Sequence, residues 1–256
     1  MKITFLGTGT SQGVPIIACQ CKVCHSSDPR DKRLRSSVLV EVDGKTLVID
    51  SGPDFRYQML RASVMHLDAI LYTHEHKDHT AGLDDVRAYN YVQQAPMDIY
   101  LEERVLQSIK REYAYVFAEE KYPGVPELNV HIINEHPFLI GNTEIIPIRA
   151  LHYKLPLLGF RIGNFTYITD ANYVSDEEKK KIEGSKYIVI NSLRRETHVA
   201  HYSLSEALAF LNEFKPEKGF ITHCSHQLGM YSEIAPELPV NIELAYDGLV
   251  IVDGGC

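Results

Sequence analysis

The run THEHKDH, residues 73–79, constrains the fold of this chain more than any other feature. Within six residues it places four potential metal ligands, which are His74, His76, Asp78 and His79. Side chains at this spacing cannot all point the same way on a regular helix or strand, so a loop must present them. The loop follows AILYT, residues 69–73, which predicts a buried strand.

Three further potential ligands, His152, Asp170 and His223, come later in the chain. Imidazole suits zinc and similar transition metals, and carboxylates suit harder ions, so a mixed set is compatible with Zn, Mn or Fe. A single catalytic zinc needs three protein ligands, and the candidates are too many for one. The set therefore indicates two metals that share a bridging carboxylate and a bridging hydroxide.

A second candidate site lies in the cysteines. Cys19, Cys21 and Cys24 supply three thiolates within six residues, and a tetrahedral structural zinc needs one more ligand. His226, three residues after His223, is the first candidate for that ligand, and Cys224 competes with it. An odd, clustered set of 5 cysteines suits a metal site better than a disulfide framework, which indicates reduced thiols.

Composition limits the class of protein and its partners. The 256 residues, 45% of them hydrophobic, are enough for one large α/β domain over residues 1–256. No apolar run is long enough to span a membrane and no basic leader is visible, so we expect a soluble, cytoplasmic protein. A net charge of -8 disfavours nucleic acid as a partner, but a small anionic substrate needs only local cations. A homodimer is compatible with the sequence.

Strands and helices alternate along the chain. Residues 3–7, 37–42 and 46–50 predict strands, with Asp43-Gly44 as the turn between the last two. Gly163-Asn164 predicts a second tight hairpin, which would place Asp170 at the far end of the following strand.

Two helices are also predicted. Ser203 and Glu206 form a capping box before an amphipathic segment, and residues 101–120 have the pattern of one long helix. Strands interleaved with helices in both halves indicate an αβ/βα sandwich.

The residues before the capped helix could act on a substrate. Either His198 or His201 could protonate a leaving group, and the amides at the start of the helix would favour an anion there. Arg194 and Arg195 could hold a phosphate, although a solvated surface position explains them equally well.

The run THEHKDH resembles the H-x-H-x-D-H motif of the metallo-β-lactamase superfamily, and the resemblance extends to His152, Asp170 and His223. It implies an α/β fold with a four-layer αβ/βα metallo-β-lactamase sandwich. It also implies that one metal is held by His74, His76 and His152, that the other is held by Asp78, His79 and His223, and that Asp170 bridges them.

Two aspartates refine what the resemblance implies. The β-lactamases proper have a cysteine at the position of Asp170, whereas phosphodiesterase branches use aspartate, so lactam hydrolysis is disfavoured. In similar proteins an aspartate at the position of Asp50 supports the metal loop without binding metal. A turn or helix-capping role is the alternative for Asp50.

The cysteine cluster, with a histidine three residues beyond the last ligand, resembles the phosphoribosyl 1,2-cyclic phosphate phosphodiesterases of bacterial phosphonate breakdown. The resemblance implies a phosphodiesterase that hydrolyses a small cyclic phosphate by attack of a metal-bridging hydroxide. Its cofactors would be two divalent ions, Zn or Mn, and one structural Zn. The catalytic residues would be Asp78 and His201. His201 is chosen because similar enzymes use the histidine directly before the helix.

Two alternatives stay open at this point. One is an RNA 3′-processing endonuclease, since the tRNA 3′-processing enzymes share the ligand set but add a basic arm that this chain lacks. The other is a noncatalytic metal-binding protein, since the hydrolase-like protein of pyrroloquinoline quinone biosynthesis has a related cysteine cluster.

Overall fold

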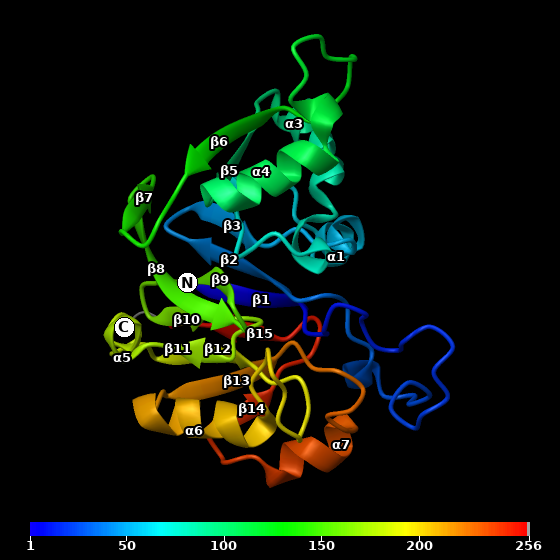
Figure 1. The fold of residues 1–256 in the computed structure, drawn as a ribbon, viewed down its shortest axis with the longest axis vertical. Helices are drawn as coiled ribbons and strands as arrows, with labels where there is room; N and C mark the ends of the chain where they lie inside the picture. The colour runs from blue at the N-terminus through cyan, green and yellow to red at the C-terminus, as the bar shows by residue number, and fades with distance from the viewer. Residues whose placement is uncertain (255–256) are drawn as a thin grey trace. The chain divides into compact units, whose positions relative to one another are not determined.

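The computed structural model describes residues 1–254, which form two compact units. Unit 1 comprises Met1–Leu6, Ser37–Asn134 and the segment from Val250, and unit 2 comprises Gly7–Ser36 and Glu135–Leu249. Each unit has one β-sheet with helices, so the predicted α/β class with two sheets is confirmed (Figure 1). The single domain over residues 1–256 stays a prediction. Within residues 1–254 no helix is both long and apolar enough to cross a membrane.

Unit 1 has a seven-stranded sheet. Its strands, in spatial order, are β15 (Val250–Val252), β1 (Lys2–Gly7), β2 (Ser37–Val42), β3 (Lys45–Ile49), β4 (Ala69–Leu71), β5 (Met97–Leu101) and β6 (Leu128–Ile132). Asp43 and Gly44 join β2 to β3 with φ of 50° and 74°, as a two-residue hairpin requires. Strands β3 to β6 are parallel, so the residues that follow β3 and β4 leave the sheet at the same edge.

The longer helices of unit 1 lie beside the parallel strands (Figure 1). They are α1 (Phe55–Arg61), α3 (Arg87–Gln93) and α4 (Glu103–Glu112), and the shorter ones are α2 (Lys77–Thr80) and the 3₁₀ helices Leu83–Val86 and Ala114–Val116. Phe55, Tyr89 and Val105 pack from these helices into one apolar cluster with Val48 and Ile70 of the sheet.

The prediction of one helix over residues 101–120 is wrong in its length. Helix α4 ends at Glu112, because Tyr113 leaves the helical region at φ -112° and ψ 44°. A short 3₁₀ helix follows instead. Aromatic and β-branched residues after Glu112 lose side-chain freedom in a helix, which explains the weak propensity of this stretch.

Unit 2 has an eight-stranded sheet. Its main order is β11 (Tyr173–Val174), β8 (Thr143–His152), β9 (Leu155–Ile162), β10 (Phe165–Tyr167), β12 (Tyr187–Asn191), β13 (Lys218–Thr222) and β14 (Ile242–Leu244), and β7 (Phe138–Ile140) pairs with β8. Gly163 and Asn164 form the predicted hairpin between β9 and β10. Asp170 follows β10 rather than ending it, because the strand stops at Tyr167.

The helices of unit 2 include α6 (Leu204–Phe214), with α5 (Asp176–Lys179), α7 (Tyr231–Ile234) and the 3₁₀ helices Pro29–Asp31 and Ala235–Glu237. The predicted capping box of α6 is confirmed, since the Glu206 amide donates to Ser203 Oγ (3.4 Å) and the Ser203 amide donates to Glu206 Oε2 (2.8 Å). Ala207 and Leu211 of α6 are buried in the apolar cluster of the sheet. This box fixes where α6 begins, at Leu204, three residues after His201.

Candidate metal centre

The first set of predicted ligands lies in unit 1, on the segment that follows β4 and runs into α2. His74, Asp78 and His79 are buried, whereas His76 is exposed. The ring centroids of His74 and His76 are 4.6 Å apart, and those of His74 and His79 are 4.3 Å apart. The turn from β4 into α2 therefore brings these histidines together, although Asp78 and His79 lie in α2 and not in the predicted loop.

Asp50 holds this segment in place without being one of the seven ligands. It follows β3, is fully buried, and accepts hydrogen bonds from the Thr73 amide and the Thr73 hydroxyl, both at 2.8 Å. Its second oxygen lies 2.7 Å from His79 Nδ1. Burial raises the pKa of the Asp50 carboxyl, and the neighbouring His79 offsets part of that shift. Thr73 Oγ1 in turn lies 2.9 Å from His74 Nδ1.

The second set of predicted ligands lies in unit 2. Asp170 follows β10 and His223 follows β13, two parallel strands with β12 between them, while His152 ends β8. His223 Nε2 lies 3.0 Å from Asp170 Oδ1. Donor atoms of His152, Asp170 and His201 all lie within 4.8 Å of one another, which makes them a candidate metal-binding group.

Nearby polar groups orient the histidines of this second set as well. His223 Nδ1 lies 3.1 Å from Ser36 Oγ, and His152 Nδ1 lies 2.8 Å from the Ala200 carbonyl. Asn191, at the end of β12, accepts from the Ala171 amide and donates to the Ala171 carbonyl, which holds the residue after Asp170.

The chemistry of these donors fits divalent metal ions. In His74, His79, His152 and His223 the Nδ1 atom faces an oxygen, which leaves Nε2 as the nitrogen that can bind a metal. Metal-binding histidines almost always have such a partner on the other ring nitrogen. Imidazole together with carboxylate is a donor set suited to zinc or manganese.

Three of these residues have unusual backbone angles. Asp50, Asp170 and His223 have φ of 64°, 59° and 55°, in the left-handed region that non-glycine residues seldom occupy. Strain of this kind persists where the surrounding structure enforces it, and it is common at functional sites. It is therefore consistent with a functional role for these strand ends.

His201 lies beside the second set but is not one of the seven predicted ligands. Its ring centroid is 4.5 Å from that of His152 and 5.2 Å from that of His223. Its Nδ1 is buried and has no hydrogen-bond partner within the described part of the chain, and Asp170 Oδ1 is 3.7 Å away. Burial lowers the pKa of His201 to about 3, so the ring is neutral near pH 7. His198 is less buried, and its ring centroid is 5.1 Å from that of His201. Burial lowers the pKa of His198 as well.

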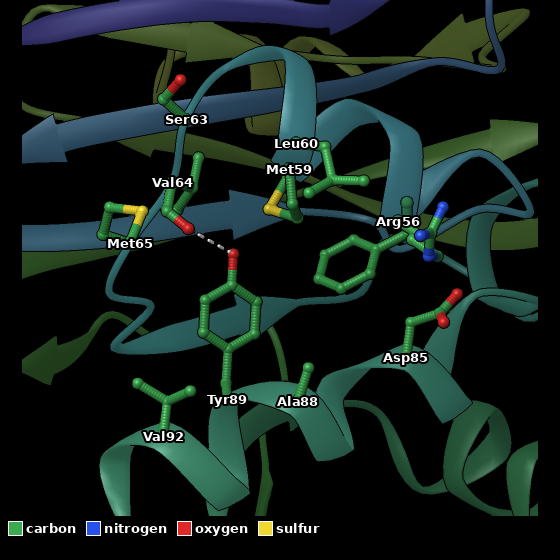
Figure 2. Close-up of a pocket in the computed structure, with 11 residues that line it drawn as sticks. Arg56, Met59, Leu60, Ser63, Val64, Met65, Asp85, Ala88, Tyr89 and Val92 are labelled. Atoms are coloured by element: carbon green, nitrogen blue, oxygen red, sulfur yellow. Dashed lines mark hydrogen bonds between the residues drawn. The ribbon is translucent and has the colours of Figure 1, made fainter.

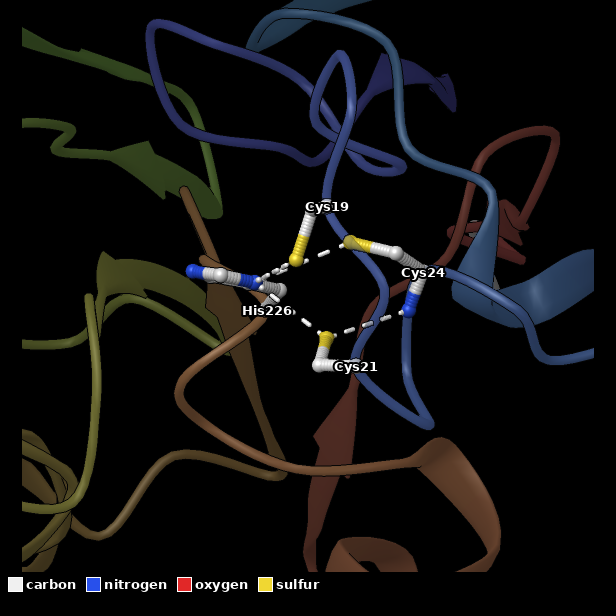
Figure 3. A group of neighbouring side chains, drawn as sticks. All are labelled: Cys19, Cys21, Cys24 and His226. Atoms are coloured by element: carbon white, nitrogen blue, oxygen red, sulfur yellow. Dashed lines mark hydrogen bonds between the residues drawn. The ribbon is translucent and has the colours of Figure 1, made fainter.

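The cysteine cluster forms a compact site in unit 2 (Figure 3). His226 Nδ1 lies 3.2, 3.3 and 3.6 Å from the Sγ atoms of Cys19, Cys21 and Cys24. Zn–S bonds of about 2.3 Å and Zn–N bonds of about 2.0 Å at tetrahedral angles separate S from N by about 3.5 Å. The four side chains therefore fit one tetrahedral ion, and Val14 and Val23 pack beside the cysteines.

The thiols of the described cysteines differ in acidity. The Cys24 amide donates to Cys21 Sγ and lowers the pKa of Cys21 to about 6, whereas burial raises that of Cys24 to about 11. Cys224, the alternative fourth ligand, is not among the donors gathered around His226, and burial raises its pKa to about 11. The geometry therefore favours His226 over Cys224.

The two arginines that could hold a phosphate are tied to neighbouring groups. The Arg194 guanidinium donates to the carbonyls of Glu196 and Thr197, at 3.4 and 3.0 Å. Arg195 donates to Glu237 at 2.7 Å. These contacts explain both residues without a substrate.

A separate pocket of about 370 Å³ lies in unit 1 between α1 and α3 (Figure 2). Its lining is mostly apolar, with Phe55, Met59 and Val92 among the residues, and the Tyr89 hydroxyl donates to the Val64 carbonyl at 2.8 Å. None of the residues that line it is one of the seven predicted ligands. This pocket is therefore separate from the candidate metal-binding residues.

Several supporting residues were not singled out from the sequence. Thr73, Ser36 and Asn191 each position a ligand or its neighbour. Thr73 was open to prediction, because a hydroxyl residue directly before the first ligand is well placed to bond it. Ser36 and Asn191 carry no such local signal, since their partners lie far away in the sequence.

Comparisons with known proteins agree with these features. Residues 45–224 match the family model of the beta-lactamase superfamily domain. A crystal structure of a new diphosphatase from the PhnP family has a TM-score of 0.92 and 35% identity, and the match covers 100% of this chain and 98% of that one. Together with the two donor sets, these findings define a metallo-hydrolase of the metallo-β-lactamase fold. The chain belongs to the beta-lactamase superfamily and, within it, to the PhnP family.

Two other relatives widen the comparison. The octanoyltransferase of Porphyromonas gingivalis is 38% identical over 257 residues, which cover 99% of this chain and 52% of that protein. The chain thus spans about half the length of the curated relatives it matches. Zn²⁺-bound PqqB from Methylobacterium extorquens has a TM-score of 0.78 at 18% identity, over 98% of this chain and 100% of that one, and shares the fold.

Replacing Asp50 tests its role in supporting the metal ligands. In Asp50→Asn, an amide nitrogen that can only donate takes the place of one carboxylate oxygen, so Thr73 or His79 loses its acceptor. We expect metal affinity to fall by about 10- to 100-fold, as for other residues that support metal ligands. Titration against a chelator measures this, with Asp176→Asn as control because the Asp176 side chain is 96% exposed. Equal affinity in both variants would show that Asp50 does not support the site.

Replacing Cys21 tests the cysteine site. We expect Cys21→Ser to lose one zinc per chain and to unfold at a lower temperature, because three donors hold zinc less tightly than four. Elemental analysis and thermal unfolding measure the two effects. The matched control is Cys224→Ala, which removes a buried thiol outside the cluster. This variant should keep the zinc of the cysteine cluster. Native zinc content in Cys21→Ser would rule out this site.

Proposed function

We propose that the protein is a metal-dependent phosphodiesterase that hydrolyses a small cyclic phosphate of the phosphoribosyl 1,2-cyclic phosphate type. The group of His152, Asp170 and His201 in unit 2 carries the proposal, because it combines two predicted ligands with a buried histidine whose Nδ1 has no hydrogen-bond partner in the described chain. An aspartate at position 170, as in the phosphodiesterase branches, favours phosphoesters over lactams. The full-length likeness to a PhnP-family diphosphatase supports phosphorus chemistry.

By the family resemblance, the two ligand sets would hold two divalent ions, Zn or Mn, and Asp170 would be a ligand of both. The family resemblance is what joins the two sets in this proposal. Bound metal ions supply a nucleophile from water at neutral pH and neutralise charge on the phosphoryl oxygens. A third ion, zinc, would be held by Cys19, Cys21, Cys24 and His226.

In the proposed reaction, water is added across one P–O bond of the cyclic ester. Its oxygen bonds to phosphorus as the ester P–O bond breaks, and one proton must reach the leaving alkoxide. His201 is proposed to deliver that proton. Burial lowers the pKa of His201 to about 3, and a phosphate anion beside the ring would favour the protonated form.

Other substrates are proposals of lower rank. A diphosphate belongs in the substrate panel because one relative is a diphosphatase. An octanoyl thioester belongs there because another relative is an octanoyltransferase, half of which this chain matches. The net charge of -8 disfavours RNA, and a metal-loaded protein inert towards the whole panel would favour a noncatalytic role.

Hydrolysis of a phosphoribosyl 1,2-cyclic phosphate by the metal-loaded protein is the direct test. We expect turnover that stops when a chelator removes the metals and returns when Mn²⁺ or Zn²⁺ is added, because the metals activate the water. Phosphorus NMR would identify the bond that breaks. Faster turnover of a diphosphate, an octanoyl thioester or precursor tRNA would replace the cyclic phosphate as substrate.

Replacing His201 tests its assignment as the acid. We expect His201→Ala to lower kcat on an alkyl cyclic phosphate by about 10²- to 10⁴-fold, the usual contribution of general acid catalysis. A nitrophenyl ester, whose leaving group needs little protonation, should lose far less. His198→Ala is the control, and metal content must stay native in both variants. Equal losses on both esters would show that His201 is not the acid, and a larger loss in His198→Ala would move the role to His198.

A further inference from the structure

The ligand segment of unit 1 lies along one face of helix α4. Residues 74–80 carry four predicted ligands, but the short helix α2 gives them little backbone support of their own. Between the ligands stand two charged residues, Glu75 and Lys77, and both pair with α4. Ligands and helix contacts therefore alternate along the start of this segment.

Three residues of α4 form the stripe that faces the segment. Arg104, Ser108 and Glu112 are spaced by four, which places them in one line along a helix. Ser108 is buried, with only 6% of its surface exposed, and its hydroxyl donates to Glu112 Oε1 at 3.4 Å. A small side chain at the centre of the stripe lets the chain approach closely between the two charged ends.

The contacts hold the segment at both ends. The Arg104 guanidinium donates to both carboxylate oxygens of Glu75, which stands between His74 and His76. At the other end Lys77 pairs with Glu112, and the Tyr113 hydroxyl donates to the Thr80 carbonyl at 3.2 Å. The apolar side of α4, with Val105 and Ile109, is meanwhile buried in the core of unit 1.

These pairs are unsuited to a purely stabilising role. Lys77 is 66% exposed and Arg104 is 33% exposed, and ion pairs at such positions add little to global stability. The charge-assisted hydrogen bonds from Arg104 Nη1 to both oxygens of Glu75, however, depend on direction as well as distance. Metal ligands need that directional precision, because catalytic geometry tolerates only small displacements.

We propose that α4 is a positioning element for the metal centre and that Arg104 is a positioning residue, which acts through Glu75 on His74 and His76. The proposal rests on the proposed metal centre but not on the identity of its substrate. Loss of the Arg104–Glu75 contact should leave the fold intact, let the segment move, and weaken metal binding.

Metal affinity of the whole 256-residue chain tests the proposal. Mn²⁺ is the probe, since thiolate sites such as the cysteine cluster do not favour it, and competition with a chelator gives the Kd. We expect Arg104→Gln and Glu75→Gln each to raise the Kd by about tenfold, at the low end for residues that support metal ligands. The metal-free variants should unfold at the temperature of the control Arg111→Gln, which removes the same charge as Arg104→Gln from an exposed position of the helix.

A charge swap separates positioning from loss of charge. In the double variant Glu75→Arg with Arg104→Glu, the contact is rebuilt in reverse and the Kd should return to within about threefold of native. Arg104→Lys, which keeps the charge but not the planar fork, should fall between native and Arg104→Gln.

Two results would overturn the proposal. One is a native Kd in Arg104→Gln, and the other is a loss of affinity that follows a matching loss of stability in the metal-free protein. Failure of the proposed function looks different, because it would leave every phosphoester intact while Mn²⁺ still binds and Arg104→Gln still weakens that binding.

Discussion

The buried carboxylate of Asp50 is the interaction on which the ligand segment of unit 1 depends. It receives hydrogen bonds from the amide and hydroxyl of Thr73 and faces Nδ1 of His79. A buried donor left without an acceptor costs about 1–3 kcal/mol, so these groups have a strong preference for the arrangement observed. Thr73 passes the constraint on to His74. One carboxylate therefore orients two imidazole rings, and helix α4 also contacts the same segment, through Glu75 and Lys77.

Unit 2 also orients its predicted histidine ligands by hydrogen bonds to Nδ1, but with different groups. A hydroxyl and a backbone carbonyl face Nδ1 of His223 and His152, and the amide of Asn191 holds the backbone beside Asp170. In both units the predicted ligands follow the carboxyl ends of strands, where loops can converge while the sheet stays rigid. Left-handed backbone angles at Asp50, Asp170 and His223 show how tightly these turns are determined by what surrounds them.

Much of the local structure could be predicted because its signals are local. Asp43-Gly44 forms the expected hairpin, and the capping box of Ser203 and Glu206 starts α6 where the sequence indicated. The helix predicted over residues 101–120 ends early, at Glu112, because propensity is a weak constraint once Tyr113 turns out of the helix. Asp170 stands three residues beyond β10, since strand ends depend on pairing with neighbouring strands as much as on the residues themselves.

The sequence by itself determined which side chains can bind metal. Dense His, Asp and Cys spacing is a property of neighbouring residues, and the chemistry of those donors does not depend on the fold. Only the tertiary structure decided how the donors are oriented: it paired Asp50 with His79, brought His226 rather than Cys224 to the three thiolates, and set Arg104 against Glu75. Serine, asparagine and arginine serve many purposes, and the partners of Ser36, Asn191 and Arg104 are far away along the chain. Their roles become visible only when folding brings those partners within hydrogen-bonding distance.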